Sequence, residues 1–335
     1  FWSSFEMNGE LTCCGADRGD AAMIAFGAAH YVLASGDKSI ADELWPLIEW
    51  SLDYCDRQKN EDGVIQSDSD EMEGRIPTGN ANLSTSSLYY GALLLAADLG
   101  REIGLPSRQV KLYEKQAAGL KKAIESYFGA TIEGLDTYRY FKGHEHLRHW
   151  ICLPLVMGIN DRKEGTREAL FSKLWMDNGV RVEYNPDLKE PDLFWDRGTL
   201  YAFRGAFKAG ATDKAMEKLK AYSATRLLGF HVPYVVEAWP EGNMAHLSAE
   251  SALYCRIFTE GLLGIDPTGL DQFSIAPHLP SDWPGYELNN MQAFGKNINV
   301  SVTRENQQLR LKIAQDDQLI FNQLVDKGKR VIVKL

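Results

Sequence analysis

A short polar segment of this sequence holds four carboxylates within six positions. They are Asp68, Asp70, Glu71 and Glu73, and Arg75 follows two positions later. Like charges this close raise one another's pKa where they are partly buried, and such a carboxyl group can donate a proton near neutral pH. The segment is therefore a candidate source of a general acid, with Glu73 and Glu71 preferred over Asp70. The alternatives are a solvated acidic loop and a calcium site, although the run lacks EF-hand spacing.

A further carboxylate, Glu237, ends an apolar run and is followed by Trp239 and Pro240. Proline stiffens the chain after it, and tryptophan offers a flat apolar surface to a sugar ring. Glu237 is therefore a candidate general base, and Trp239 a candidate sugar contact. The alternatives are a surface-loop position for Glu237 and a helix-capping role for Glu241.

A third candidate segment, residues 194–198, precedes a predicted helix that begins near Thr199. In the functional interpretation Trp195 is a platform for a sugar ring, and Asp196 and Arg197 bind its hydroxyl groups. In the structural interpretation Asp196 caps the helix or forms an ion pair with Arg197. The sequence favours neither interpretation over the other.

Histidines gather between positions 144 and 149. The cluster comprises His144, His146 and His149, with Glu145 and Arg148 between them. The spacing differs from the HExxH pattern of zinc enzymes, so no metal site is predicted. His144 is predicted to contact a polar ligand, whereas Trp150 suits packing in a core.

Asp17, Arg18 and Asp20 stand at the junction between a loop and the first predicted helix. Capping of that helix by Asp17 or Asp20 is the default interpretation. All three residues are also candidates for substrate contact. The sequence contains no Walker loop, dinucleotide fingerprint or Gly-x-Ser-x-Gly motif, so no cofactor is predicted.

Helical hairpins are the elements that must position these residues. Apolar periodicity predicts helices over residues 20–35, 39–58, 81–103, 107–128 and 248–262, with weaker pairs at 146–157 with 163–175 and 199–209 with 214–227. The links at 35–38 and 104–107 are short, which makes the joined helices antiparallel neighbours. The longer loops, which hold the charged and aromatic clusters, then emerge at one end of the bundle.

The pattern changes after about Pro267, where apolar residues alternate with period two. The alternating runs cover residues 273–275, 298–302, 309–313 and 331–333. The sequence therefore predicts a mainly α fold, with a helical domain over residues 1–266 and a small antiparallel β domain over residues 267–335.

Composition limits the classes of function. The chain has 335 residues and a net charge of −10, which argues against nucleic acid or an anionic membrane as a partner. No apolar run approaches the roughly 20 residues of a membrane-spanning helix. Five cysteines without paired spacing do not indicate a disulfide framework. The chain opens at Phe1 without a signal sequence, which indicates a processed or truncated product.

Three of these segments resemble motifs of the six-hairpin (α/α)6 toroid glycosidases, a class that includes α-L-rhamnosidases and processing α-glucosidases. Residues 236–239 are similar to the Trp-Glu-x-Trp segment that supplies the base in the rhamnosidases, with Val236 in place of the first Trp. Residues 194–198 resemble the Tyr-Trp-Arg-Gly motif of the glucosidases, with Asp196 inserted. Residues 70–77 resemble the loop that holds the general acid of the glucosidases.

The resemblance implies an (α/α)6 toroid, and residues 260–283 look like the passage from such a toroid to a C-terminal β domain. It also implies a glycoside hydrolase, mostly of the inverting type, with Glu237 as base and an acid from residues 68–73. Trp195, Trp239, Arg197 and His144 would line the sugar pocket. The toroid looks short by one helix, and the implied setting is periplasmic or secreted.

Two other functions stay open. An α/α toroid also hosts polysaccharide lyases, for which His144, Tyr140 and Arg148 are the candidate residues. The third possibility is a glycan-binding protein without catalysis. All three functions predict an oligosaccharide or polysaccharide as the partner molecule. Glycoside hydrolysis needs no cofactor, whereas a lyase needs a His or Tyr base and a group that neutralises a uronate, such as Asn, Arg or calcium.

Overall fold

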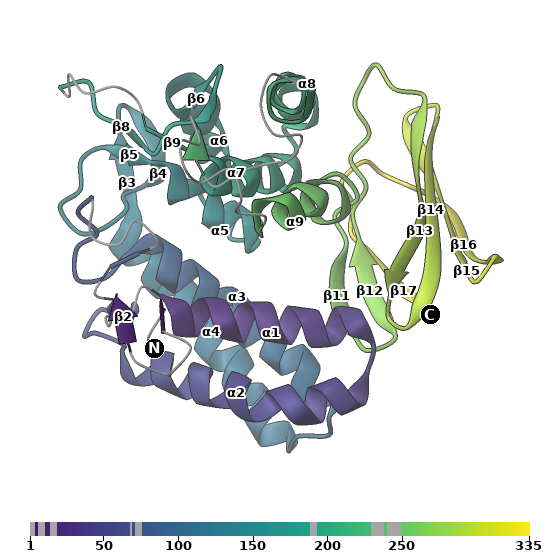
Figure 1. The fold of residues 1–335 in the computed structure, drawn as a ribbon, viewed down its shortest axis with the longest axis horizontal. Helices are drawn as coiled ribbons and strands as arrows, with labels where there is room; N and C mark the ends of the chain where they lie inside the picture. The colour runs from purple at the N-terminus through teal and green to yellow at the C-terminus, as the bar shows by residue number, and fades with distance from the viewer. Residues whose placement is uncertain are drawn as a thin grey trace. The chain divides into compact units, whose positions relative to one another are not determined.

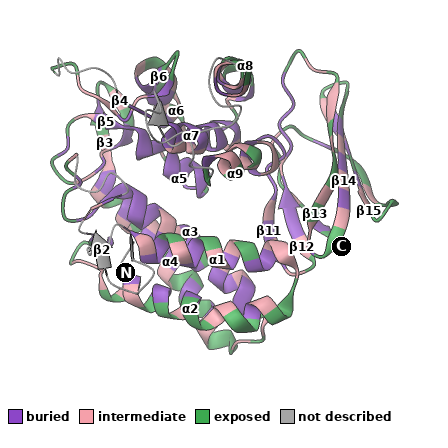
Figure 2. Cartoon of the chain, in the orientation of Figure 1, coloured by how far each residue is buried: buried purple, intermediate pink, exposed green. Residues whose placement is uncertain are grey.

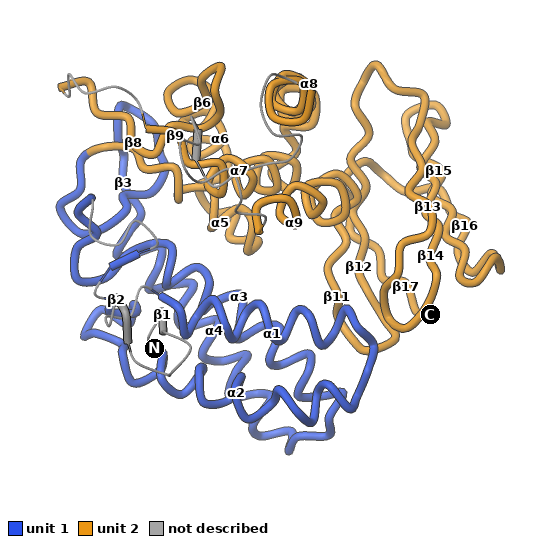
Figure 3. Tube along the Cα trace, viewed as in Figure 1, with its two compact units in different colours: residues 1–145 blue, residues 146–335 orange. Residues whose placement is uncertain are grey.

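The computed structural model describes residues 19–67, 69–70, 76–187, 193–228 and 249–335, together with the backbone of residues 4–5, 11–13 and 238–239. The chain forms two compact units, residues 1–145 and residues 146–335, which Figure 3 colours separately. Among the described helices, none combines the length and the apolar character needed to cross a bilayer.

The first unit is built from helical hairpins (Figure 1). Its described helices are α1 (Asp20–Ser35), α2 (Lys38–Arg57), α3 (Leu83–Glu102) and α4 (Ser107–Phe128). The short strands are β1 (Ser4–Phe5), β2 (Leu11–Cys13), β3 (Gly129–Ile132) and β4 (Leu135–Tyr138). The helices predicted from apolar periodicity over residues 20–128 are confirmed, with ends within two residues of those predicted.

The link between α1 and α2 reverses the chain within two residues. Gly36 adopts a positive φ of 71°, and its N–H donates to the carbonyls of Val32 and Leu33. The Asp37 carboxylate then accepts a hydrogen bond of 2.8 Å from the N–H of Ser39. Glycine ends one helix and aspartate caps the next, which makes α1 and α2 an antiparallel pair.

Small residues bring α1 and α3 together in the core of this unit. The buried face of α1 is mostly alanine, and the buried face of α3 combines alanine, serine and glycine. Helices with such faces approach closely. By contrast, α2 and α4 each bury one face and leave the other in solvent, as the exposed residues of α2 in Figure 2 illustrate.

The second unit begins with short, irregular elements. They are β5 (Leu147–Arg148), η1 (His149–Ile151), α5 (Cys152–Val156), α6 (Lys163–Ala169), η2 (Leu170–Leu174), β6 (Trp175–Met176), β7 (Gly179–Val180), β8 (Glu183–Tyr184) and β9 (Phe194–Trp195). The helix predicted over residues 146–157 is shorter than predicted, because Leu147 and Arg148 pair as a strand with Tyr184 and Glu183. The helix predicted over residues 163–175 ends at Leu174, where Trp175 enters a strand.

Further helices follow and form the helical core of the second unit. They are α7 (Asp196–Lys208), α8 (Thr212–Leu228), α9 (Ala249–Arg256) and η3 (Ile257–Leu262), and the strand β10 (Ala238–Trp239) lies between α8 and α9. Gly205 of α7 allows close packing on α5, since a Cβ at this position would lie 3.0 Å from the carbonyl oxygen of Cys152.

Two antiparallel sheets complete the second unit. One contains β11 (Asp266–Gly269), β12 (Gln272–Ile275) and β17 (Val331–Lys334), in that order. The other contains β13 (Gly285–Ala293), β14 (Lys296–Glu305), β15 (Gln308–Gln315) and β16 (Gln318–Val325). Both sheets contribute to one apolar core, with Phe273 and Val333 from one and Val300 and Leu311 from the other. Helical hairpins followed by antiparallel β structure confirm the predicted fold class, whereas the domain boundary after residue 266 stays a proposal.

Candidate active site

The acidic segment, which holds the four carboxylates at positions 68–73, lies in the chain between the end of α2 and the start of α3. A bridge between Gln66 and Ala81 brings its two ends together, and a bridge between Lys59 and Ile65 closes the turn that follows α2. Asn82 then caps α3, since its Oδ1 accepts hydrogen bonds from the N–H of Thr85 at 2.9 Å and the hydroxyl of Ser84 at 2.8 Å. The Asn82 amide also donates to the carbonyl of Ser69 at 3.2 Å, which ties the cap to the acidic segment.

Asp70 is the candidate acid whose position the structure describes, and it has no exposed surface. Its Oδ2 accepts a hydrogen bond of 2.6 Å from the phenol of Tyr140, and that phenol lies 2.9 Å from the hydroxyl of Ser84. A hydrogen bond to an ionised carboxylate is about twice as strong as one between neutral groups. This arrangement holds Asp70 firmly and keeps it away from solvent.

His144 lies on a segment that packs against the same loop. It is 8% exposed and stacks on Phe141, with ring centroids 4.6 Å apart. Phe141 in turn lies against Gly79, where a Cβ would stand only 2.6 Å from the Phe141 side chain. The first unit therefore brings residues 76–82 and residues 140–144 together, and Asp70 and His144 belong to one loop region.

Asp20 begins α1 at the same end of the first unit. Gly19 precedes it with φ of 84°, and a Cβ on Gly19 would lie 2.6 Å from Oγ1 of Thr85. Only glycine fits so close to the first turn of α3. Asp20 is half-buried beside this contact, so the start of α1 lies alongside the helix that Asn82 caps.

In the second unit, two candidate segments that are far apart in sequence pair with each other. Strands β9 and β10 are antiparallel, with Ala238 opposite Trp195 and Trp239 opposite Phe194. This pairing juxtaposes the predicted platform residue with the segment that follows Glu237. The side chain of Trp239 lies outside the described residues, and that of Trp195 is 5% exposed.

The first turn of α7 makes two ion pairs with later helices. Asp196 is fully buried and binds Arg226 of α8 through both oxygens, at 2.8 and 2.9 Å. Arg197 donates from Nε to the buried carboxylate of Glu250 on α9, at 2.8 Å. These contacts give Asp196 and Arg197 a structural role, and sugar contact by either stays a prediction. Sequence reasoning missed Arg226 and Glu250, since nothing local indicates partners 30 and 53 positions away.

The remaining candidates lie outside the described residues. They are Asp17, Arg18, Glu71, Glu73 and Glu237. Of the residues considered for a lyase, Tyr140 and Arg148 are buried, and Arg148 pairs with Glu183 at 3.0 Å. Within the described ranges no group of three His, Cys, Asp or Glu side chains has the arrangement of a metal site.

Solved structures define the class of this fold. A sialidase aligns with 92% of this chain at 14% identity and a TM-score of 0.71, and the chain covers 32% of it. A rhamnosidase from a Bacillus species aligns with 87% of the chain at 14% identity and a TM-score of 0.61, with 31% of it covered. A rhamnose-bound rhamnosidase from Klebsiella oxytoca aligns with 77% at 13% identity and a TM-score of 0.56, with 50% covered. The chain has the fold of the six-hairpin (α/α)6 glycosidases, as its motifs predicted.

Two curated proteins of similar sequence are phosphorylases. An N,N'-diacetylchitobiose phosphorylase from Vibrio proteolyticus is 22% identical over 77% of this chain, and one from Vibrio furnissii is 21% identical over 83%. The chain spans about two fifths of the length of these relatives, 39% and 41% respectively. A search of protein-family models found no match.

Proposed function

We propose that this chain carries the catalytic toroid of an enzyme that cleaves glycosidic bonds in an oligosaccharide or polysaccharide. The pairing of β9 with β10 supports the proposal most directly. It joins the Trp195 segment to the segment of Glu237 and Trp239, and a sugar site needs flat aromatic rings beside carboxylates. The fold, which the chain shares with glycosidases, supports the same class of reaction.

In the proposed mechanism two carboxyl groups act on opposite sides of the scissile bond. Glu237 is the general base that activates the attacking water, and Glu73 or Glu71 is the general acid that protonates the leaving oxygen. Inversion requires about 6.5–9.5 Å between the two carboxyl groups, which leaves room for the water. Asp70 is a positioning residue, because a carboxylate buried against Tyr140 has no surface to offer a substrate.

Phosphorolysis is the second candidate, and the similarity to two phosphorylases favours it. In that reaction inorganic phosphate takes the place of water as the nucleophile, and the product is a sugar phosphate. The general acid from residues 71–73 keeps its role, whereas a base that deprotonates water is not required. The two candidates therefore differ in whether Glu237 is needed for turnover.

A product assay separates the two reactions. The protein is incubated with a panel of aryl glycosides and oligosaccharides, with and without inorganic phosphate, and the products are resolved by chromatography. Hydrolysis predicts free sugar in both conditions, and phosphorolysis predicts a sugar phosphate only when phosphate is present. Binding of the panel without product in either condition would refute both reactions and favour a glycan-binding protein. An unsaturated product absorbing in the ultraviolet would instead identify a lyase.

The role of Glu237 is tested by E237Q. Loss of general-base catalysis is expected to lower kcat about 10²–10⁴-fold and to leave sugar binding intact. The matched control is E241Q, the same chemical change four positions away, which is expected to keep kcat. Turnover by E237Q at the rate of the unmodified protein would exclude the assigned base.

A further inference from the structure

We propose that the free edge of strand β16 is a self-association surface, where a second copy of this chain adds its own β16 in antiparallel orientation. The observations that lead to this proposal are the position of the strand, its sequence, its exposed side chains and the charges at its two ends. It is independent of the function proposed above.

Strand β16 is an outer strand of its sheet, because the order is β13-β14-β15-β16. One side of β16 pairs with β15, and the other side carries backbone donors and acceptors that face away from the sheet. Soluble proteins usually protect such an edge with lysine, proline, an inward-pointing charge or a bulge. Residues 318–325 read Gln-Leu-Ile-Phe-Asn-Gln-Leu-Val and contain no lysine, proline or charged side chain, so a single bulge is the protection that this strand carries.

Two large apolar side chains on this edge strand are exposed. Leu319 is 55% exposed and Leu324 is 41% exposed. The strand register sets them opposite Ala314 and Arg310 of β15, on the face of the sheet that points away from the core. Ile320 is an extra residue between the pairs formed by Leu319 and Phe321, so the strand contains a bulge at this point.

A twofold axis perpendicular to the sheet through Asn322 brings these side chains together. Such an axis keeps each residue on its own face, so Asn322 meets the Asn322 of the second copy and Phe321 lies opposite Gln323. Leu324 then lies opposite the bulge at Leu319 and Ile320. Each copy therefore covers the exposed leucines of the other, and the contact is the same in both directions.

The charges at the two ends of β16 are complementary in this orientation. The turn before the strand holds Asp316 and Asp317, for a charge of −2. The segment after it, residues 326–330, holds one Asp, two Lys and one Arg, for a charge of −1 + 3 = +2. Antiparallel pairing sets each acidic turn beside the basic segment of the second copy, which favours this orientation over a parallel one.

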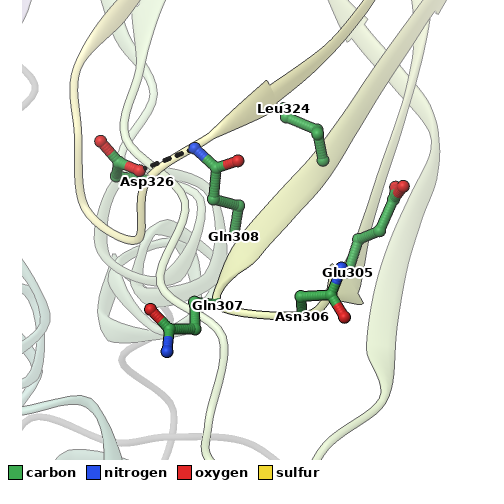
Figure 4. Close-up of a pocket in the computed structure, with 6 residues that line it drawn as sticks. All are labelled: Glu305, Asn306, Gln307, Gln308, Leu324 and Asp326. Carbon is green, nitrogen blue, oxygen red and sulfur yellow. Dashed lines mark hydrogen bonds between the residues drawn. The ribbon is translucent and has the colours of Figure 1, made fainter.

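The basic end of the strand is also held in place before association. Gln308 donates a hydrogen bond of 3.0 Å to Asp326, which ties the first residue of β15 to the residue that follows β16. Figure 4 shows this bond and the open polar hollow beside Leu324, lined by Glu305, Asn306 and Gln307. Glu305 is neutralised by Arg310 at 2.8 Å, so the acidic turn of the second copy meets a net positive surface.

The expected association is weak and reversible. A single pair of eight-residue strands buries less area than the roughly 1,200–2,000 Å² of a stable interface. We therefore expect a dissociation constant on the order of 10–100 µM. At low concentration the protein is expected to sediment at its chain mass of 37.6 kDa, and at high concentration to approach twice that mass.

The test uses opposite charges at the proposed twofold axis. N322K and N322D each set two like charges directly opposite each other, which is expected to weaken association at least about tenfold. An equal mixture of the two variants sets Lys opposite Asp, and association is expected to recover. Asn322 is exposed on an outer strand, so both variants are expected to fold, which circular dichroism checks.

The matched control is T303K, which adds the same charge to the same face of the sheet on the central strand β14. It is expected to sediment as the unmodified protein does at every concentration. Three outcomes would overturn the proposal. They are a monomer at all concentrations up to several hundred micromolar, a dimer that N322K and N322D leave unchanged, and a mixture of the variants that stays monomeric.

Discussion

At the scale of single residues, buried polar side chains decide how the acidic segment is held. Asp70 accepts a hydrogen bond from Tyr140, Tyr140 lies beside Ser84, and Ser84 donates to the cap residue Asn82. Each of these four side chains is buried. Because an unsatisfied buried polar group is costly, the chain of hydrogen bonds is more stable as a whole than in part. The segment that carries Glu71 and Glu73 therefore starts from a rigid residue.

The first prediction concerns Y140F, which removes the hydroxyl group that donates a hydrogen bond to Asp70. The variant leaves a buried carboxylate with one donor fewer, so we expect the free energy of unfolding to fall by about 1–3 kcal/mol. If Asp70 positions the catalytic loop, kcat falls and its pH profile shifts, whereas KM changes little. Chemical denaturation and a pH–rate profile measure the two effects.

The control for Y140F is Y89F in the same unit. Tyr89 is also fully buried, and its hydroxyl donates to a neutral acceptor, the carbonyl of Leu52, at 3.2 Å. Its loss is expected to cost about 1 kcal/mol and to leave the pH profile unchanged. Equal effects of the two variants on the profile would contradict a positioning role for Asp70.

At the scale of elements, the first turn of α7 organises the helical part of the second unit. Strand β9 runs directly into this turn and pairs with β10. Asp196 then binds α8, and Arg197 binds α9. Gly198 completes the turn, since a Cβ there would lie 2.3 Å from the ring of His149. Three successive residues thus connect α7 to three other elements.

The second prediction tests the contact between α7 and α8. D196A leaves Arg226 buried with its main counter-charge removed, and breaking a buried ion pair costs about 3–5 kcal/mol. The matched control is D282A, which breaks the exposed pair between Asp282 and Lys220 and is expected to cost about 0–1 kcal/mol. Thermal denaturation measures both variants. Similar stabilities for D196A and D282A would show that the Asp196–Arg226 pair does not join the helices.

At the scale of the whole molecule, the sequence predicts elements whose periodicity is local and misses those that depend on distant partners. The amphipathic helices α2 and α4 and the alternating strands β14 and β15 follow directly from apolar spacing. The outer strands β13 and β16 escaped prediction, because bulges interrupt their alternation. The two-residue strands between residues 147 and 195 exist only through pairing, which no local pattern records. The same limit applies to the site, where the partners of Asp196 and Arg197 come from later helices.

In the second unit, a buried histidine lies where the last helix meets the β sheets. His278 is 5% exposed, and its backbone N–H donates to the carbonyl of Leu262 at the end of η3. Its ring lies against Gly328 of the loop between β16 and β17. Burial, together with the positive charges of Lys327 and Lys208, lowers the pKa of His278 to about 4 from its ordinary value of 6.5.

The last prediction follows from this lowered pKa. Between pH 6.5 and about 4 the unfolded chain binds a proton at His278 that the folded protein does not, so the stability contributed above pH 6.5 is lost as the pH falls. The full loss is about 3 kcal/mol. Denaturant unfolding across this pH range measures it, and H278Q should flatten that part of the curve. K327Q, at an exposed position, removes one repelling charge, raises the pKa of His278 and should reduce the loss. A pH dependence that neither variant alters would show that the junction does not govern the acid stability of the molecule.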